Sequence, residues 1–299
     1  MNGYGIEMDK LERFLSRAEG LLERLEGLLP QPVGAVDWER SVAFRWRVRQ
    51  GQGYLQPVPQ ISAITLDDLQ NVDRQKQLIE ANTRQFVQRL PANNVLLTGA
   101  RGTGKSSLIK ACLNRFAANG LRLIEVDKDD LHELGDIIES VAQRPERFIV
   151  FCDDLSFEEG EPGYKALKVA LDGSIAAQSD NLLIYATSNR RHLLPEYMSD
   201  NESYRPTSEG EIHPGEAVEE KISLSERFGL WVSFYPFKQD DYLAIIRHWL
   251  KHFGCSDADC EQARSEALTW ALERGSRSGR VAWQFARDWS GRQSNQRAG

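Results

Sequence analysis

Short apolar runs and amphipathic segments alternate through the middle of the chain. The runs are mostly uninterrupted by charge, which is typical of parallel strands buried on both faces. The segments between them place apolar residues three and four positions apart, which indicates helices. This alternation predicts an α/β fold, a parallel five-stranded sheet flanked by helices. The expected strands are residues 95–98, 121–126, 147–154, 181–189 and 231–235, and the expected helices include residues 65–90, 108–113, 131–142 and 164–177.

The beginning of the chain has a helical pattern of its own. Apolar positions 11, 15, 18, 22, 25 and 29 are separated alternately by four and three residues, the rhythm of a helix with a narrow apolar seam, and Pro30 ends it. Two hypotheses remain open for residues 8–29. The helix is either a short coiled-coil or partner-binding arm, or an element that packs on its own domain.

A second pattern near the beginning predicts a strand. Residues 43–49 alternate apolar side chains with Arg45, Arg47 and Arg49, so that one face of a strand would be buried. The glycines that follow would return the chain through residues 54–57 as a hairpin. The arginine row either tracks nucleic-acid phosphates or forms the solvated face of an edge strand, where charge discourages aggregation.

The end of the chain is helical throughout. Residues 238–299 carry three amphipathic patterns, which predict a small helical lid. We therefore expect an N-terminal extension at residues 1–60, the α/β domain at 61–237 and the lid at 238–299. Within the α/β domain, the long polar segment 190–223 is either a partner or substrate loop or a flexible connection.

Composition restricts the class of protein. The chain has 299 residues, of which 41% are hydrophobic and 27% are charged, and its formal charge is −7. That charge argues against wholesale coating of nucleic acid without excluding a local basic stripe. No apolar run approaches the roughly 20 residues of a membrane helix, and we expect no membrane partner and a cytoplasmic location. Four cysteines in this length favour reduced, buried thiols.

One motif predicts a phosphate-binding loop. Gly99-Ala100-Arg101-Gly102-Thr103-Gly104-Lys105-Ser106-Ser107 follows an expected strand and precedes an expected helix. Glycines allow the backbone amides to point at an anion, and the helix N-terminus adds its positive dipole end. We expect Lys105 to reach the β- and γ-phosphates of a nucleotide and the Ser106 hydroxyl to ligate Mg²⁺.

Two carboxylates end a later strand. Asp153 and Asp154 end the expected buried strand 147–154, the pattern of a second nucleotide motif. Asp153 is expected to hold Mg²⁺ together with Ser106, and Asp154 to polarise the attacking water. Residues 187–189 end the next strand, and ligands collect at the carboxyl ends of parallel strands. We therefore expect them near the γ-phosphate.

Two further readings concern ligands. Ile64, Leu69 and Val72 precede the phosphate loop and either contact the adenine base or pack in the core. A zinc site is a further hypothesis for His248, His252, Cys255 and Cys260, but the spacing of these residues is poor for zinc ligands.

Together these motifs resemble the AAA+ ATPases. The resemblance identifies Asn189 as the polar sensor 1 residue that orients water against the γ-phosphate. The segment 224–230 is similar to the one that carries the arginine finger in bacterial Holliday-junction branch-migration ATPases, which makes Arg227 the finger. Residues 278–282 resemble their sensor 2 helix and place Arg280 near the phosphates. Residues 44–249 look like a bacterial family of predicted ATP-binding AAA+ proteins of uncharacterised role.

The resemblance implies an ATPase that binds and hydrolyses Mg-ATP between the subunits of a homo-oligomer and remodels an unidentified protein or nucleic acid. The chain departs from many AAA+ proteins by having Asp154 where they have glutamate. We keep Asp154 as the expected residue, with Glu158 or Glu159 as the alternative. An ATP-dependent switch or binding module with little hydrolysis is the alternative. A small-molecule kinase would need an arginine-rich lid, which Arg280 alone hardly provides.

Overall fold

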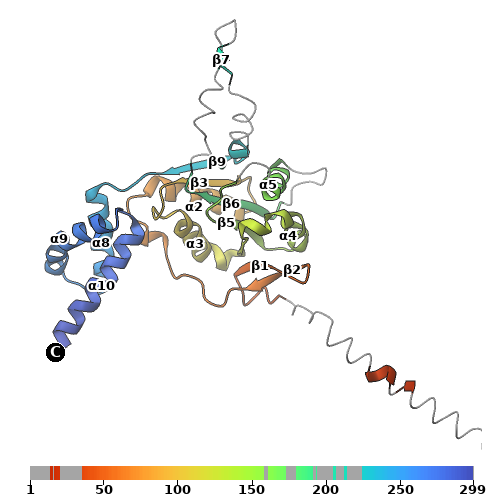
Figure 1. Cartoon of the computed structure of the whole chain (residues 1–299), viewed down its shortest axis with the longest axis horizontal. Coiled ribbons are helices and arrows are strands. Elements are labelled where there is room, and N and C mark those ends of the chain that lie inside the picture. The colour runs from red at the N-terminus through yellow and green to blue at the C-terminus, as the bar shows by residue number, and fades with distance from the viewer. Residues whose placement is uncertain are drawn as a thin grey trace, which may run out of the picture.

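The computed structural model describes residues 14, 15, 17–20, 36–157, 161–172, 180–190, 193, 205–206, 212–213 and 224–298. Its main feature is a sheet in the order β2-β1-β4-β5-β6-β3-β9 (Figure 1). Five of these strands are the predicted ones, and all neighbouring pairs among them are parallel. They are β4 (Leu121–Glu125), β5 (Arg147–Cys152), β6 (Leu182–Ser188), β3 (Val95–Gly99) and β9 (Leu230–Phe234). The predicted α/β fold is therefore confirmed.

The sheet has seven strands rather than the predicted five, because the N-terminal hairpin joins it. Strand β1 (Ala43–Arg49) runs parallel to β4, and β2 (Gln52–Pro57) pairs antiparallel with β1. The backbone N–H of Leu123 donates to the carbonyl of Val42, which continues the β1–β4 ladder. Strand β2 rather than β1 forms the edge, so the reading of residues 43–49 as an edge strand was wrong.

The arginine row on β1 is engaged by acidic residues. Arg45 Nε lies 2.7 Å from Glu125 Oε2, and Arg47 Nη1 lies 2.5 Å from Asp127 Oδ2. The hydrogen bond and charge of Glu125 raise the pKa of Arg45. Two of the three guanidinium groups therefore pair with carboxylates at the end of β4, which weakens the reading of this row as a phosphate track.

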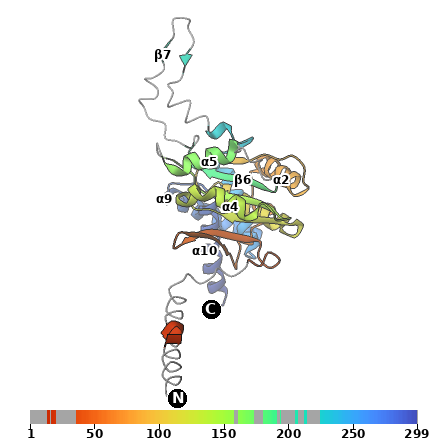
Figure 2. The same ribbon diagram turned by 90° about the vertical axis from the view of Figure 1, so that its right-hand side faces the viewer.

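Helices cover both faces of the sheet. Alternation along β3 turns Val95 and Leu97 to one face and Leu96 to the other. The first face packs against α2 (Asp73–Val87) and α3 (Lys105–Phe116), and the second against η3 (Lys128–Glu133), α4 (Leu134–Val141) and α5 (Pro162–Asp172). In Figure 2, α2 and α5 lie on either side of β6. The two apolar cores thus hold the carboxyl ends of the parallel strands in one row.

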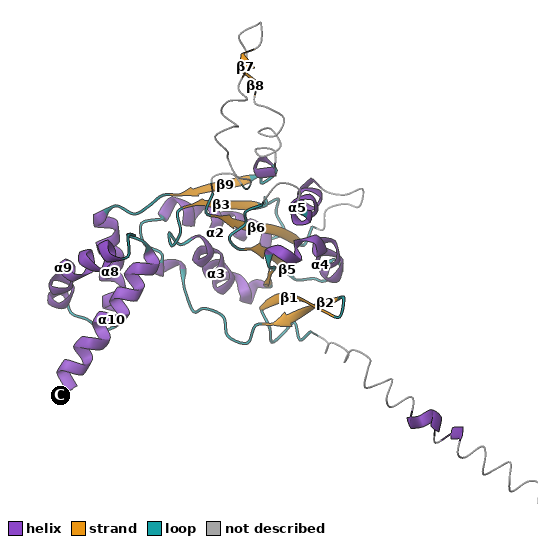
Figure 3. Cartoon of the chain, viewed as in Figure 1, coloured by secondary structure: helices purple, strands orange, loops and turns teal. Residues whose placement is uncertain are grey.

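A third apolar cluster holds the C-terminal helices together. These are α8 (Gln239–His252), α9 (Asp257–Glu273) and α10 (Gly279–Ala298), which gather beside the sheet (Figure 3). Ser256 caps α9 by accepting a hydrogen bond from the Asp259 N–H. Tyr242, Phe285 and Trp289 are buried among them. The predicted helical pattern of this region is found in three packed helices.

The segment before β3 differs from its predicted single helix. A short 3₁₀ turn, η1 (Leu66–Asp68), is followed by a break, and α2 then begins at Asp73. Thr65 and Asp68 form a capping box at the start of this turn, and the extended backbone of Leu69 ends it. Leu69 and Val72 lie in the break and are buried. The break matters because it brings this segment against the phosphate loop.

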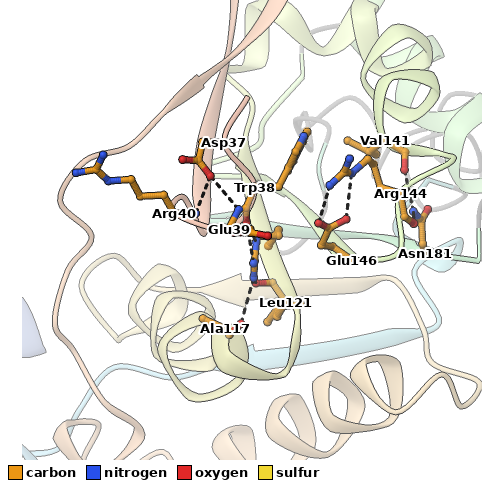
Figure 4. Close-up of polar contacts among 11 residues, drawn as sticks. Asp37, Trp38, Glu39, Arg40, Ala117, Leu121, Val141, Arg144, Glu146 and Asn181 are labelled. Carbon is orange, nitrogen blue, oxygen red and sulfur yellow. Dashed lines mark hydrogen bonds and ion pairs between the residues drawn. The ribbon is translucent and has the colours of Figure 1, made fainter. Parts of the chain in front are cut away.

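Just before the chain enters the sheet, Trp38 forms an anchor at the amino ends of the strands, opposite the phosphate loop (Figure 4). The carbonyl of Trp38 accepts hydrogen bonds from the Arg122 guanidinium at 2.9 and 3.2 Å. The Trp38 ring packs against Phe44 and Phe148, and the Arg144 guanidinium lies 4.9 Å from its centroid. Arg122 and Phe148 stand at the beginnings of β4 and β5, so this anchor lies away from the carboxyl ends.

Most residues of the predicted N-terminal helix and of the segment 190–223 lie outside the described residues. Residues 14, 15 and 17–20 are helical, and Phe14 and Leu15 are exposed. Within the later segment, the two-residue strands β7 (Arg205–Pro206) and β8 (Ile212–His213) pair antiparallel. Glu158 and Glu159 also lie outside the described residues.

The four cysteines agree with the predicted reduced, buried thiols. All four cysteines are free and buried, and burial raises the pKa of the Cys112 and Cys152 thiols to about 12. Such thiols are unreactive near neutral pH. None of the helices among the described residues is both long and apolar enough to cross a bilayer.

Candidate nucleotide-binding site

The predicted phosphate loop connects β3 to α3, and its glycines are required by its backbone. Gly99, Gly102 and Gly104 have φ angles of +127°, +72° and +102°, which side-chain-bearing residues rarely adopt. A Cβ atom on Gly99 would also lie 1.9 Å from the carbonyl oxygen of Phe234 on β9. The loop therefore turns tightly at the point where α3 begins.

Lys105 is held at the centre of the loop. Its buried ammonium donates hydrogen bonds to the carbonyl oxygens of Gly99 at 2.6 Å and Ala100 at 2.8 Å, and to Asn189 Oδ1 at 3.0 Å. Burial lowers the pKa of Lys105, and the charges of Asp154 and Asp153 partly oppose this effect. The contact with Asn189 links the loop to the end of β6.

The predicted metal pair is in direct contact. Ser106 Oγ donates to Asp153 Oδ1 at 2.6 Å, joining the first turn of α3 to the end of β5. A hydroxyl and a carboxylate are hard oxygen donors of the kind that Mg²⁺ prefers. The chemistry of this pair therefore fits the predicted ion.

Asp154 stands beside two donors in an uncommon backbone conformation. Its φ is +53°, in the left-handed region. Asn189 Nδ2 donates to Asp154 Oδ1, and Arg101 Nη2 lies 3.7 Å from Asp154 Oδ2. The loop, the acidic strand end and the predicted sensor thus form one connected polar network.

These residues line a cavity of about 880 Å³, a size within the range of small-molecule sites. Gly99 and Ala100 do not line it themselves, but their carbonyls orient Lys105. Ile64, Leu69 and Val72 line it at the side of the break before α2. The predicted site residues on its wall are Arg101, Gly102, Thr103, Gly104, Lys105, Ser106, Ser107, Asp153, Asp154, Asn189 and Arg280.

The C-terminal helices close the cavity on one side. The N–H of Gly279, where α10 begins, donates to the carbonyl of Gly102 at 2.8 Å. On α8, His248 Nε2 lies 3.2 Å from Asp68 Oδ1 on η1. Both contacts join the lid helices to the phosphate loop and to a segment beside it, so movement of the lid would be transmitted to these segments.

Several residues on the cavity wall, in the lid and just before it, were not predicted from the sequence. Phe237, Ile245, Trp249, His252 and Trp283 all line the cavity. The helical spacing of Ile245 and Trp249 indicated only an apolar face. Because the wall combines these aromatic and aliphatic groups with the polar loop, the cavity suits a ligand with an apolar planar part and an anionic part.

Arg227 does not lie in this cavity. Its Nε is 2.5 Å from Asp172 Oδ1, at the end of α5, and it is absent from the cavity wall. The structure therefore brings together every predicted site residue except Arg227. Their roles in binding and catalysis stay predictions.

The zinc reading gains no support. Among the described residues, no group of three or more histidine, cysteine, aspartate or glutamate side chains is arranged to hold a metal ion. His248 instead contacts Asp68, and Cys255 and Cys260 are buried in the cluster between the lid helices.

Comparisons with known proteins agree with this architecture. Two solved variants of RuvB from Thermotoga maritima, at 16% and 15% identity, each match with a TM-score of 0.50 over 75% of this chain. The chain spans only 63% and 64% of their length. A chain of the HORMA:CdnC:Trip13 complex of Escherichia coli MS115-1 matches at 12% identity with a TM-score of 0.47, over 75% of this chain and 90% of that one. Among curated proteins, none matches the sequence significantly.

Likeness at such low identity shows the fold alone, and that fold is the AAA+ fold. Residues 39–293 match the sequence model of one protein family, which covers most of the chain. The protein therefore belongs to DUF815, a family of proteins of unknown function.

Proposed function

We propose that this protein is an AAA+ ATPase that binds and hydrolyses Mg-ATP at sites shared between subunits of a homo-oligomer. The observation that carries the proposal is the contact network at the cavity wall. It joins the loop lysine, the hydroxyl–carboxylate pair and the acid–amide pair, which the sequence places on three different segments. The work of hydrolysis would remodel an unidentified protein or nucleic acid.

Nucleotide binding would rest on the loop and the start of α3. Backbone amides and the positive end of this helix attract phosphate oxygens, and Lys105 supplies a full charge. The aromatic residues Trp249 and Trp283 on the lid helices and Leu69 beside the loop offer an apolar surface for the base. The cavity thus provides for both ends of ATP.

The metal would be held by Ser106 and Asp153. When bound with ATP, Mg²⁺ supplies positive charge that neutralises the phosphate oxygens. Asp154 would accept a proton from the attacking water, and Asn189 would orient that water. The side chain of Asp154 is one carbon shorter than that of glutamate, so the attacking water would have to lie closer to the backbone of residue 154.

Arg227 would act on the site of a neighbouring subunit. In its own subunit it pairs with Asp172 and lies off the cavity wall. An arginine finger typically contributes roughly 10³–10⁵ in rate. Arg280 lines the cavity from the lid and would contact the phosphates within its own subunit.

One observation favours a second candidate, an ATP-dependent switch with little hydrolysis. The carboxylate proposed as the base already accepts a hydrogen bond from Asn189 and lies near Arg101. These donors occupy oxygens that would otherwise face the attacking water. A switch would bind ATP through the same loop and move the lid without hydrolysing the nucleotide.

Turnover per subunit across a wide range of protein concentration tests the proposal. Lys105→Ala serves as the blank because it removes the loop charge. We expect specific activity to rise with concentration, and Arg227→Ala to abolish it without weakening ATP binding. ATP binding with turnover at the blank level throughout would overturn the ATPase and favour the switch.

A further inference from the structure

We propose that Thr187 is a positioning residue that sets both acids of the site, Asp153 for the metal and Asp154 for the water. This inference rests on the proposed function, which assigned Thr187 no role of its own. Thr187 is 1% exposed, near the end of β6. It acts through the two carboxylates and not on the nucleotide itself.

The hydroxyl of Thr187 joins the two acids. Its Oγ1 donates to Asp153 Oδ1 at 2.6 Å and accepts the backbone N–H of Asp154 at 2.9 Å. A hydroxyl has one hydrogen to give, and an ionised carboxylate can only accept. The direction of both bonds is therefore fixed, and only a hydroxyl at this position satisfies both partners.

Strand register explains why this threonine meets the acids. Cys152 pairs with Ala186 in the β5–β6 ladder, so Asp153 and Thr187 are the next residues of the two parallel strands. The carbonyl of Thr187 also accepts the N–H of Leu155 at 2.7 Å. The turn at residues 153–155 is thus bound to β6 on both sides of Asp154.

The backbone of Asp154 needs this support. A non-glycine residue at φ +53° is strained and persists where surrounding contacts hold it. The hydroxyl of Thr187 holds its N–H, while Ser106 Oγ and Thr187 Oγ1 converge on the same oxygen of Asp153. Loss of the hydroxyl would free the Asp153 carboxylate to rotate away from Ser106.

Thr187→Val and Thr187→Ser test the inference, since valine keeps the shape and serine keeps the hydroxyl. Partners that orient a metal ligand are typically worth about 10–100-fold in metal affinity. We expect Thr187→Val to raise the Mg²⁺ concentration for half-maximal turnover by about tenfold or more. Affinity for ATP without Mg²⁺ should stay within about twofold of wild type, since the loop is untouched. Thr187→Ser should restore the Mg²⁺ dependence.

Thr83→Val is the matched control. Thr83 is also fully buried, and its hydroxyl bonds the Ile79 carbonyl and the Tyr185 hydroxyl, away from the cavity wall. It should lower thermal stability and leave the Mg²⁺ dependence unchanged. If Thr187→Val does not fold, Thr187→Ala replaces it in the same comparison.

Binding of a fluorescent ATP analogue, with and without Mg²⁺, separates this inference from the proposed function. If the wild type binds nucleotide more tightly with Mg²⁺ but shows no turnover, hydrolysis fails while Thr187→Val still tests the positioning role. Wild-type Mg²⁺ dependence in folded Thr187→Val overturns the inference. Equal defects in Thr187→Val and Thr187→Ser also overturn it, because the hydroxyl would then not be the active group.

Discussion

Single residues carry the chemistry of this site through hydrogen bonds that cross between elements. Lys105 meets Asn189 across 84 residues of sequence, and Ser106 meets Asp153 across 47. Each contact joins a residue of the phosphate loop or α3 to the end of a strand. The arrangement of the site therefore depends on a few positions where two backbone segments lie close together.

Gly99 is such a position, and Gly99→Ala should destabilise the protein. An added Cβ would meet the Phe234 carbonyl at 1.9 Å, and the φ of +127° is unfavourable for alanine. We expect a loss of about 2 kcal/mol or more in the free energy of unfolding, measured with urea. ATP binding should also weaken, since strands β3 and β9 must separate.

Gly120→Ala is the control for that change. Gly120 also has a positive φ, +91°, but an added Cβ would meet nothing within 4 Å. It should cost only the backbone term, roughly 1 kcal/mol. Equal losses in the two variants would contradict the role given to the β3–β9 contact.

Motif residues could be assigned from the sequence because their chemistry requires fixed types at fixed spacing. The glycines, Lys105 and Asp153 follow this rule, and the structure places them on one network. Thr187 was predicted near the phosphates, but its bond to Asp153 depends on the register between two strands. The sequence of either strand alone does not determine this register.

At the scale of elements, buried parallel strands were predictable and their neighbours were less so. Long apolar runs can only be buried on both faces, which gave the five strands. The pairing of β1 with β4 was not predicted, because strands pair through backbone hydrogen bonds, which every residue except proline can form. The position of Trp249 and Trp283 on the cavity wall was not predicted for a related reason. An amphipathic pattern shows that a helix has an apolar face but not what that face contacts.

The contact between η1 and α8 makes a prediction about pH. Burial alone would raise the pKa of Asp68, but hydrogen bonds from Thr65 and His248 lower it below its ordinary value. A carboxyl with a lowered pKa contributes stability above its unfolded pKa, and this contribution is lost as the pH falls through the folded pKa. Asp68→Asn should therefore be less stable than wild type near pH 7, and the difference should shrink below about pH 4.

Urea unfolding of both proteins across this pH range checks the prediction. Asp67→Asn is the control, because Asp67 is the exposed neighbour in the same turn. It should change stability little at any pH. A difference between wild type and Asp68→Asn that persists unchanged at low pH would show that the contact does not depend on the ionised carboxylate.

At the scale of the whole molecule, the site lacks one predicted part. The cavity gathers the loop, the acids, the sensor and the lid arginine, whereas Arg227 pairs with Asp172 outside it. The Trp38 anchor lies at the amino ends of β4 and β5, away from the cavity. Under the proposed function, a second copy of the chain supplies the arginine finger that completes the site.

Mixing two inactive variants tests this central claim most directly. Arg227→Ala keeps an intact site but offers no finger, and Asp154→Asn offers the finger but lacks the base. In a random equal mixture, about a quarter of the subunit interfaces combine the two intact parts, because each neighbour is drawn independently. We predict that each variant alone stays at the Lys105→Ala blank and that the mixture recovers up to about a quarter of wild-type turnover. No recovery at any mixing ratio would contradict a site shared between subunits.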